Sequence, residues 1–311
     1  MTERPEKLSE NRKDVDPRVG QLITDRIQEQ TKILLAGFPC DEGVAINNGR
    51  QGAASAPAKI RDRLKKLTPD SRMNERHTLL LNKTCDYGDI KLSGKLERDQ
   101  IQLGDLISEQ LKEDRIPVIM GGGHETSFGH FLGYVYTDRS VSILNIDAHT
   151  DVRPLKEGRA HSGSPFRQAL EHPSGCCQSY HVFGLSPSSV SAAHAAYIEQ
   201  RGGTVRFNNN TDLNTVLRCL DELESDSVMV TMDMDAVEQG AAPGVSAPAA
   251  EGISSKLWLE LAYQFGKHPK VTSFDLCEVN PKFDRDGQTI RLAALTIWYF
   301  LRGVAMQMGQ T

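Results

Sequence analysis

Two aspartates and a histidine alternate directly after an apolar stretch in the middle of the chain. The stretch at 143–151 reads Ile-Leu-Asn-Ile-Asp147-Ala-His149-Thr-Asp151. Alternate residues of an extended backbone point to the same side, so these three side chains would face one point at the end of a buried strand. Two carboxylates and an imidazole placed in this way would repel and desolvate one another unless a cation neutralised them. The spacing therefore indicates a metal site, with a polar surface loop as the alternative.

Two further apolar stretches end in residues of the same kind. The stretch at 228–235 ends in Asp233-Met-Asp235, and the stretch at 117–124 ends in Gly-Gly-Gly-His124. Open α/β sheets bind their ligands at the carboxyl ends of their strands. Three strand ends that supply a histidine, Asp-x-His-x-Asp and Asp-x-Asp favour the metal site over the polar loop.

The charge of this set predicts two metal ions. Its four carboxylates carry four negative charges, which two divalent cations would cancel. At about 4 Å and an effective dielectric near 20, each uncompensated pair of like charges costs on the order of 4 kcal/mol. Oxygen-rich ligands without a thiolate favour manganese over zinc, and two such ions roughly 3.5–4 Å apart activate water for hydrolysis. We therefore expect two Mn²⁺ ions per chain, held by His124, Asp147, His149, Asp151, Asp233 and Asp235.

The elements that must position these residues follow a rhythm of strand, turn and helix. Eight apolar runs predict a mostly parallel sheet covered by helices, and they lie at 32–37, 78–86, 117–121, 141–147, 180–184, 204–207, 227–233 and 271–277. Helices are expected at 19–30, 56–67, 97–114, 187–201, 211–223 and 254–266. Long loops at 41–56, 121–130, 150–168 and 236–253 should gather at one end of the sheet. We expect a polar N-terminal arm and helix over residues 1–30 and a single catalytic domain over 31–311.

Composition excludes several classes of protein. A net charge of -5 without a Lys/Arg-rich run argues against nucleic-acid binding. The apolar runs are strand-sized, which argues against a membrane span, and the polar N-terminus predicts a cytoplasmic protein. Six cysteines without C-x-x-C spacing are expected to be free thiols, and no function is assigned to the Cys176-Cys177 pair.

Four motifs together resemble those of the ureohydrolase family, which includes arginase and agmatinase. The similarity runs from about residue 33 to about residue 300. The resemblance implies an arginase-like three-layer α/β fold, an eight-stranded parallel sheet flanked by helices and a dinuclear manganese centre. The motifs are Gly121-Gly-Gly-His124, Asp147-Ala-His149-Thr-Asp151, Thr231-Met-Asp233-Met-Asp235 and Cys277-Glu278-Val-Asn280-Pro281.

The resemblance also implies a role for each ligand. It makes Asp147 and Asp233 the bridging ligands of the two ions. The remaining ligands divide into His124 and Asp151 on one ion and His149 and Asp235 on the other.

Three residues are expected to take part in catalysis beside the metals. The resemblance implies that Glu278 grips the cationic C–N group of the substrate, with a structural ion pair as the alternative. His161 matches the family's mobile proton-relay histidine, with a surface histidine as the alternative. Asp151 would pass a proton to the leaving nitrogen. The other histidines are expected to be structural or solvated, namely His77, His130, His172, His181, His194 and His268.

Departures from the arginase pattern point to a particular substrate. Arginases usually have aspartate before and serine after the first histidine, where this chain has Gly123 and Glu125, and the loop at 235–248 lacks the Asp-Pro of arginases. These variants, with Arg153 and Arg167 after the central motif, resemble the branch that hydrolyses N-formimidoyl-L-glutamate to L-glutamate and formamide in histidine degradation. That substrate carries two carboxylates, which guanidinium groups bind bidentately. Arg153 and Arg167 are therefore the candidate substrate ligands, with Arg50 and Arg159 behind them.

Other functions are compatible with the same motifs. The nearest is another ureohydrolase activity, on arginine, agmatine or a guanidino acid. A catalytically silent metal-binding member and a deacetylase on a related fold are more distant alternatives. The expected partner is a small-molecule substrate, and the resemblance suggests a homo-oligomer.

Overall fold

Eight strands form one sheet in the order β2-β1-β3-β8-β7-β4-β5-β6, and every neighbouring pair is parallel. The computed structural model describes residues 16–308. Strands β1, β4 and β7 are buried along their whole length, as expected for parallel strands covered on both faces. The strands are β1 (Ile33–Phe38), β2 (Thr84–Asp89), β3 (Ile116–Gly121), β4 (Val141–Ile146), β5 (Cys177–Leu185), β6 (Thr204–Phe207), β7 (Val228–Asp233) and β8 (Val271–Cys277).

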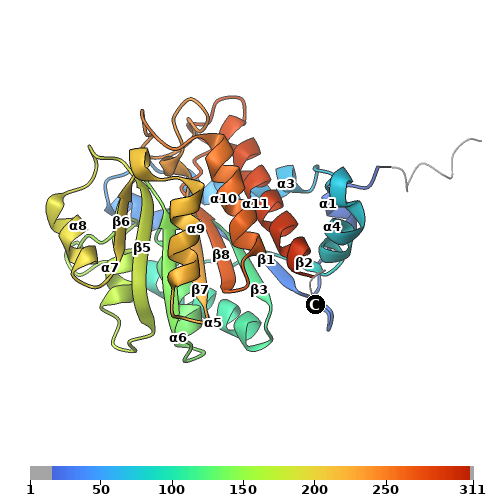
Figure 1. The fold of residues 1–311 in the computed structure, drawn as a ribbon, viewed down its shortest axis with the longest axis horizontal. Helices are drawn as coiled ribbons and strands as arrows, with labels where there is room; N and C mark the ends of the chain where they lie inside the picture. Colours follow the sequence, from blue (N-terminus) through green and yellow to red (C-terminus); the bar gives the residue numbers. More distant parts are fainter. Residues whose placement is uncertain (1–15, 309–311) are drawn as a thin grey trace, which may run out of the picture.

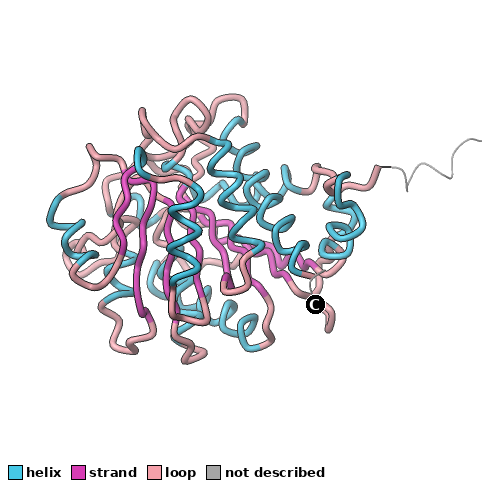
Figure 2. The backbone as a smooth tube through the Cα atoms, viewed as in Figure 1, coloured by secondary structure: helices cyan, strands magenta, loops and turns pink. Residues whose placement is uncertain are grey.

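Helices cover both faces of the sheet and complete three layers (Figures 1 and 2). One core cluster packs the sheet against α3 (Ala56–Leu64), α9 (Leu213–Glu222), α10 (Ser255–Lys267) and α11 (Gln288–Gln307). The other packs it against α5 (Leu96–Lys112), α6 (Thr126–Val135), α7 (Pro165–Leu170) and α8 (Ala192–Glu199). Shorter elements are α1 (Val19–Leu22), α2 (Glu42–Ile46), α4 (Asn74–Leu81) and the 3-10 turns η1 (Ala53–Ser55), η2 (Ser71–Met73), η3 (Asn208–Asn210) and η4 (Met234–Ala236).

Helix α11 is the longest helix among the described residues, and the sequence did not predict it. Its 20 residues would be long and apolar enough to cross a membrane, and it is the one helix within 16–308 that passes this test. However, 61% of its most apolar window is buried, and it lies beside α10 in the core. Helix α11 is therefore a core helix that contributes to the layer in front of the sheet in Figure 1.

Some predicted elements differ from the observed ones. The strand predicted at 78–86 begins only at Thr84, because the preceding residues form α4 and bury His77, Leu80 and Leu81 on one face. A short apolar run such as Leu79-Leu80-Leu81 does not distinguish a strand from a helix. The loop predicted at 121–130 gives way to α6 from Thr126 onward.

The helix predicted at 19–30 is also much shorter than expected. Only Val19–Leu22 is helical, and Thr24 then forms a parallel bridge with Cys85 beside β2. Half of the polar arm and helix predicted over 1–30 lies outside the described residues, which begin at 16.

The order of the strands places four carboxyl ends side by side. Strands β3, β8, β7 and β4 are consecutive neighbours in the middle of the sheet. The chain leaves a gap between β3 and β4 and fills it later with β7 and β8. Such a switch in connection creates a crevice at the carboxyl edge of the sheet, where α/β proteins bind ligands.

Candidate metal centre

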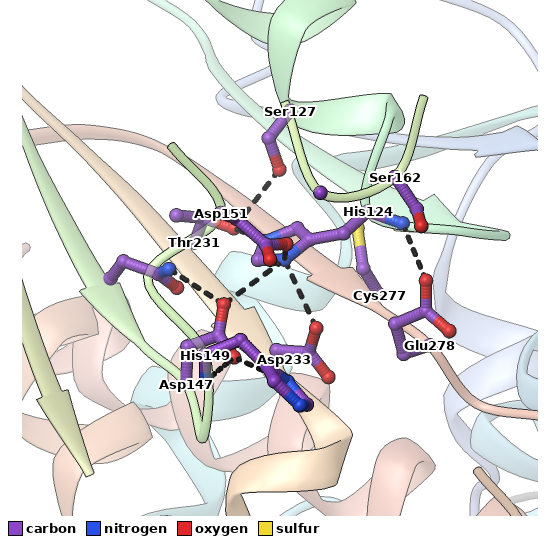
Figure 3. Close-up of polar contacts among 12 residues, drawn as sticks. His124, Ser127, Asp147, His149, Asp151, Ser162, Thr231, Asp233, Cys277 and Glu278 are labelled. Atoms are coloured by element: carbon purple, nitrogen blue, oxygen red, sulfur yellow. Dashed lines mark hydrogen bonds and ion pairs between the residues drawn. The ribbon is translucent and has the colours of Figure 1, made fainter. Parts of the chain in front are cut away.

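All six predicted metal ligands meet at this edge of the sheet. Figure 3 shows His124, Asp147, His149, Asp151 and Asp233 close together. Their side chains fall into two groups, in each of which the possible ligand atoms lie within 4.8 Å of one another. We call the group of His124, Asp147, Asp151 and Asp233 the enclosed half, and the group of Asp147, His149 and Asp235 the open half.

In the enclosed half, one histidine faces three carboxylates. The Nδ1 atom of His124 lies 3.2 Å from Asp147 Oδ2, 3.0 Å from Asp151 Oδ2 and 3.0 Å from Asp233 Oδ2. The His124 side chain is only 1% exposed. Three carboxylates around one imidazole nitrogen form a buried site with a strong excess of negative charge.

In the open half, the histidine reaches solvent. His149 Nδ1 lies 3.2 Å from Asp235 Oδ2 and 3.6 Å from Asp147 Oδ1, and the His149 side chain is 23% exposed. Asp147 thus turns Oδ2 toward His124 and Oδ1 toward His149. One carboxylate facing both halves is the arrangement that a bridging ligand requires.

The alternating motifs fold locally into turns that aim these carboxylates. Asp147 Oδ1 accepts a hydrogen bond from the backbone N–H of His149 at 2.7 Å, and Asp233 Oδ1 accepts one from the backbone N–H of Asp235 at 2.8 Å. An aspartate bonded to the N–H two residues on forms an Asx-turn. In addition, Asn145 Nδ2 donates to Asp147 Oδ2 at 2.9 Å. Each first aspartate is therefore fixed before any ion binds.

The electrostatics of the cluster fit divalent cations. Burial, with Asp235 and Asp147 close by, raises the pKa of Asp233 well above its usual value, and burial raises the pKa of Asp235 to about 6. Burial opposes protonation of His124, but the carboxylates, Asp233 first, raise its pKa well above the usual value, and Asp235 does the same for His149. Asp235 Oδ1 is buried without a hydrogen-bond partner among residues 16–308. A cation would replace the protons that this set of ligands otherwise retains.

Glu278 connects the ends of β8 and β3. Its Oε1 accepts a hydrogen bond from the backbone N–H of His124 at 2.9 Å, and its own N–H donates to Gly122 O at 2.8 Å (Figure 3). Its φ of 62° is left-handed, which is uncommon outside glycine and concentrates at functional sites. Burial, then Asp233 and Glu125, raise the pKa of Glu278 well above its usual value. Within residues 16–308 no basic side chain pairs with Glu278, so a structural ion pair does not describe it.

A cavity of about 210 Å³ opens onto both halves. His149 and Ala247 also line a neighbouring cavity of about 480 Å³, which extends over 186–189 and 247–251. The smaller cavity is lined by Asn47, Gly49, His149, Asp151, Arg153, Ser162, Asp233, Asp235, Ser246, Ala247 and Glu278.

The structure separates the two arginines proposed to bind substrate. Arg153 lines the cavity, and its Nη1 donates to Asn47 Oδ1 at 3.4 Å. Arg167 is not among the residues that line it; its Nε donates to Val152 O at 2.7 Å and its Nη1 pairs with Glu171 at 3.1 Å. The placement therefore favours Arg153 over Arg167.

Arg50 and Arg159, the second pair of candidate substrate ligands, also bond to other residues. Arg50 donates to the carbonyl oxygens of Ser246 and Val245 at 2.8 Å. Arg159 pairs with Glu42 at 2.8 Å.

His161 is buried, so the alternative of a surface histidine is wrong. Its Nδ1 accepts from the N–H of Gly163 at 3.1 Å, and its Nε2 lies 3.0 Å from Pro154 O. Because a carbonyl only accepts, Nε2 carries the hydrogen and the ring is neutral. Ser162, rather than His161, lines the cavity.

Several residues of the site escaped sequence reasoning. Asn47, Ser162 and Ser246 line the cavity from loops whose position was predicted but whose contacts were not. Glu125 is buried, accepts from the N–H of Gly43 at 2.8 Å, and has its pKa raised to about 7 by burial. Its position directly after the metal ligand His124 is the sequence signal that could have placed Glu125 near the site.

The fold and the cluster together define a class of protein. The all-parallel sheet brings four aspartates and two histidines together at its carboxyl edge. This combination defines an α/β protein with a carboxylate-rich centre for two metal ions. The sequence profile of the arginase family matches residues 31–302. The chain belongs to the arginase family.

Named relatives and a solved structure narrow this class. The chain is similar to the formimidoylglutamase of Geobacillus kaustophilus, at 37% identity over 270 residues, 83% of this chain and 80% of that protein. It is 39% identical to the formimidoylglutamase of Geobacillus thermodenitrificans over 270 residues, with the same shares. The crystal structure of Trypanosoma cruzi formiminoglutamase with Mn²⁺ superposes with a TM-score of 0.85 at 31% identity, covering 94% of this chain and 99% of that one. The predicted arginase-like three-layer fold is confirmed.

Proposed function

We propose that the protein is a formimidoylglutamase that hydrolyses N-formimidoyl-L-glutamate to L-glutamate and formamide. The observation that carries the proposal is the cavity itself, which is lined both by metal-ligand carboxylates with Glu278 and by Arg153. A substrate with a cationic amidine at one end and carboxylates at the other matches this distribution of charge. The relatives named above carry the same activity in their names.

Two manganese ions fit the six side chains that converge at the sheet edge. His124 and Asp151 would hold one ion, His149 and Asp235 the other, and Asp147 and Asp233 would be shared. The two groups of ligand atoms support the shared position of Asp147, which belongs to both, whereas Asp233 belongs to the enclosed half alone. When bound, the two ions supply an activated water near neutral pH and stabilise developing negative charge.

Residues of the chain orient the substrate in this cavity. Glu278 receives the amidinium group, and that positive charge favours the ionised form of its carboxylate. Arg153, at the exposed side of the cavity and 3.4 Å from Asn47 Oδ1, receives a carboxylate of the glutamate part. Without an arginine there, the aspartates that line the cavity would repel the substrate's own carboxylates.

Two residues move protons. Asp151 lies at the junction of the cavity and the enclosed half, and it passes a proton to the departing glutamate nitrogen. His161 exchanges protons with solvent. Because both ring nitrogens of His161 are bonded to its own loop, at Gly163 and Pro154, this role requires that loop to open during turnover.

The proposal is tested by turnover of a substrate panel with manganese-loaded protein. The panel contains formimidoylglutamate, arginine, agmatine and guanidinobutyrate, and the products are measured as formamide, glutamate and urea. Formamide and glutamate in equal amounts support the proposal. Release of urea from a guanidino compound would assign a different ureohydrolase activity, and no turnover with two ions bound would make the protein a silent member.

The same proposal includes the setting in which the enzyme acts. Residues 31–311 form one catalytic domain, a proposal supported by the single sheet that both core clusters share. The enzyme acts in the cytoplasm as a homo-oligomer. Light scattering coupled to size-exclusion chromatography tests the last point, because a mass of 34.4 kDa would identify a monomer.

A further inference from the structure

A row of polar side chains is buried between α6 and β8, behind the enclosed half. Ser127, His130 and Tyr134 lie on one face of α6, and they meet Ser273 and Asp275, which share one face of β8. All five residues are fully buried. Polar groups at such an interface destabilise the fold unless each finds a partner. The row therefore needs a hydrogen-bonded arrangement, and the structure has one.

The row begins at the metal ligand His124. His124 Nε2 lies 2.9 Å from Thr231 Oγ1, whose hydroxyl donates to Asp275 Oδ1 at 2.6 Å. On the other side of this carboxylate, His130 Nδ1 lies 2.7 Å from Asp275 Oδ2. Ser127 Oγ lies within 3.2 Å of both carboxylate oxygens and 3.1 Å from Thr231 Oγ1, and Figure 3 shows it beside Thr231 and His124.

Beyond His130 the row continues to the far end of β8. His130 Nε2 lies 2.6 Å from Ser273 Oγ, and Tyr134 OH lies 2.6 Å from both Ser273 Oγ and Thr272 Oγ1. His130 is thus held at both ring nitrogens.

Asp275 fixes the direction of these hydrogen bonds. Burial alone would raise the pKa of Asp275, but the hydrogen bonds from His130 and Thr231 help to bring it below the usual value. An ionised carboxylate only accepts, so Thr231 donates its single hydroxyl hydrogen to Asp275 and must accept from His124 Nε2–H. His130 likewise donates from Nδ1 and accepts at Nε2 from Ser273. With Nε2 donating to Thr231, Nδ1 is the ring nitrogen that faces the carboxylates of the enclosed half and would bind an ion there.

We propose that His130 is a positioning residue, which acts through Asp275 and Thr231 to hold His124 as the Nε2–H tautomer with Nδ1 facing the metal of the enclosed half. The inference rests on the proposed metal centre. Metal-ligating histidines depend on the partner of their second nitrogen for ring orientation and tautomer. Here that partner is a hydroxyl, whose direction is set by a carboxylate that His130 in turn fixes.

Three substitutions at His130 and one at Tyr134 separate positioning from packing. His130→Leu removes both ring nitrogens and leaves Asp275 without its closest nitrogen donor. His130→Asn keeps an N–H near the place of Nδ1, whereas His130→Gln places its amide near Nε2 and bonds Ser273 instead. Tyr134→Phe is the matched control, because it removes a buried hydroxyl from the same face of α6 on the far side of His130.

The readout is manganese binding to the metal-free protein, measured by the electron paramagnetic resonance signal of free Mn²⁺. We expect His130→Leu and His130→Gln to lower the affinity for one of the two Mn²⁺ ions about tenfold or more. Loss of a residue that hydrogen-bonds to a metal ligand costs roughly 10–100-fold in metal affinity. His130→Asn and Tyr134→Phe should stay within about threefold of the unsubstituted protein. Thermal unfolding of each metal-free variant is recorded alongside, so that lost stability is not mistaken for lost positioning.

Three results would overturn the inference. Manganese affinity unchanged in His130→Gln or in folded His130→Leu would show that His130 positions nothing, even if the melting temperature fell. Equal weakening by Tyr134→Phe would assign the effect to packing of α6, and so would failure of His130→Asn to restore binding. Failure of the unsubstituted protein to bind two ions is a separate outcome, because it would overturn the proposed function before any variant was made.

Discussion

The enclosed and open halves of the candidate metal centre share Asp147 but surround their histidines differently. His124 is 1% exposed, faces three carboxylates and is backed by Thr231, whereas His149 is 23% exposed and lines two cavities. In the enclosed half, folding of the chain already holds most of the ligand side chains in place. In the open half, solvent reaches the histidine ligand itself. One half is therefore built for holding an ion and the other for exchange.

The largest effect is expected at Asp147, which belongs to both halves. Asp147→Asn removes the charge that faces His124 and His149 together, so both ions should be lost. Metal ions contribute several kcal/mol of transition-state stabilisation, so kcat/KM should fall about a thousandfold or more. The measurement is turnover with bound manganese determined on the same sample. Asp221→Asn, at a residue whose side chain is 71% exposed, is the control, and retention of two ions in Asp147→Asn would contradict the division into halves.

The second effect concerns Glu278, which accepts a hydrogen bond from His124 in the enclosed half and lines the cavity that both halves share. Glu278→Gln keeps the size of the side chain and an oxygen for the His124 N–H, but it removes the charge for the amidinium group. A hydrogen bond to a charged group is worth roughly 1.5–3 kcal/mol, so kcat/KM should fall about 10–100-fold. Both ions should remain bound. Loss of manganese from this variant would place Glu278 in the metal centre instead of the substrate site.

The two halves should also release their ions unequally. We expect a chelator to remove one manganese ion per chain at a concentration about tenfold lower than the second, because the histidine of the open half is exposed to solvent whereas that of the enclosed half is not. His149→Ala should keep one tightly bound ion, whereas His124→Ala should lose it. Manganese content after dialysis against graded EDTA measures both. Release of the two ions in a single step, or an inverted pattern in the two variants, would break the comparison.

A smaller effect is expected where the open half meets the substrate. Arg153→Gln should raise KM about fivefold, because a solvent-exposed charge pair contributes roughly 1 kcal/mol. Arg159→Gln, which loses only a surface pair with Glu42, should leave KM unchanged. Arg167→Gln tests the second arginine predicted from the sequence. A rise in KM for Arg167→Gln alone would show that the loop rearranges to bring Arg167 into the cavity.

The sequence predicted what depends on short-range patterns. Each metal motif follows an apolar run and folds into a local Asx-turn, so its direction is encoded within a few residues, as at Asp147 and Asp233. Parallel strands buried on both faces likewise leave a continuous apolar signal. The fold class and the convergence of the six ligands could therefore be predicted.

The rest depends on contacts between distant segments. The first part of helix α6 was taken for a loop because glycine-rich residues precede it. The end of α4 was taken for a strand because a run of three leucines shows neither the helical nor the strand periodicity. His130 gave no local signal, since its partners Ser273 and Asp275 lie more than a hundred residues away. Which arginine reaches the cavity is likewise decided by where each loop packs.

The smallest effect comes from His77, which shows what burial alone does to a histidine. His77 is fully buried on α4, where its Nδ1 accepts from the N–H of Asp70 at 3.1 Å and its ring packs edge-on against Trp298. Burial lowers its pKa to about 4, the opposite of the shift at His124, where carboxylates outweigh burial. His77 is therefore neutral in the folded protein at neutral pH.

Because the folded pKa of His77 lies below the unfolded value of about 6.5, its contribution to stability is complete above pH 6.5 and is lost as the pH falls toward 4. Between pH 7.5 and pH 5.5 this amounts to about 1 kcal/mol, and other titrating groups cancel when a variant is compared with the unsubstituted protein. His77→Gln should therefore lose about 1 kcal/mol less than the unsubstituted protein over this range, as measured by urea unfolding. An identical loss in His77→Gln would mean that burial does not keep this imidazole neutral. The contrast with His124, in which carboxylates reverse the effect of burial, would then need another cause.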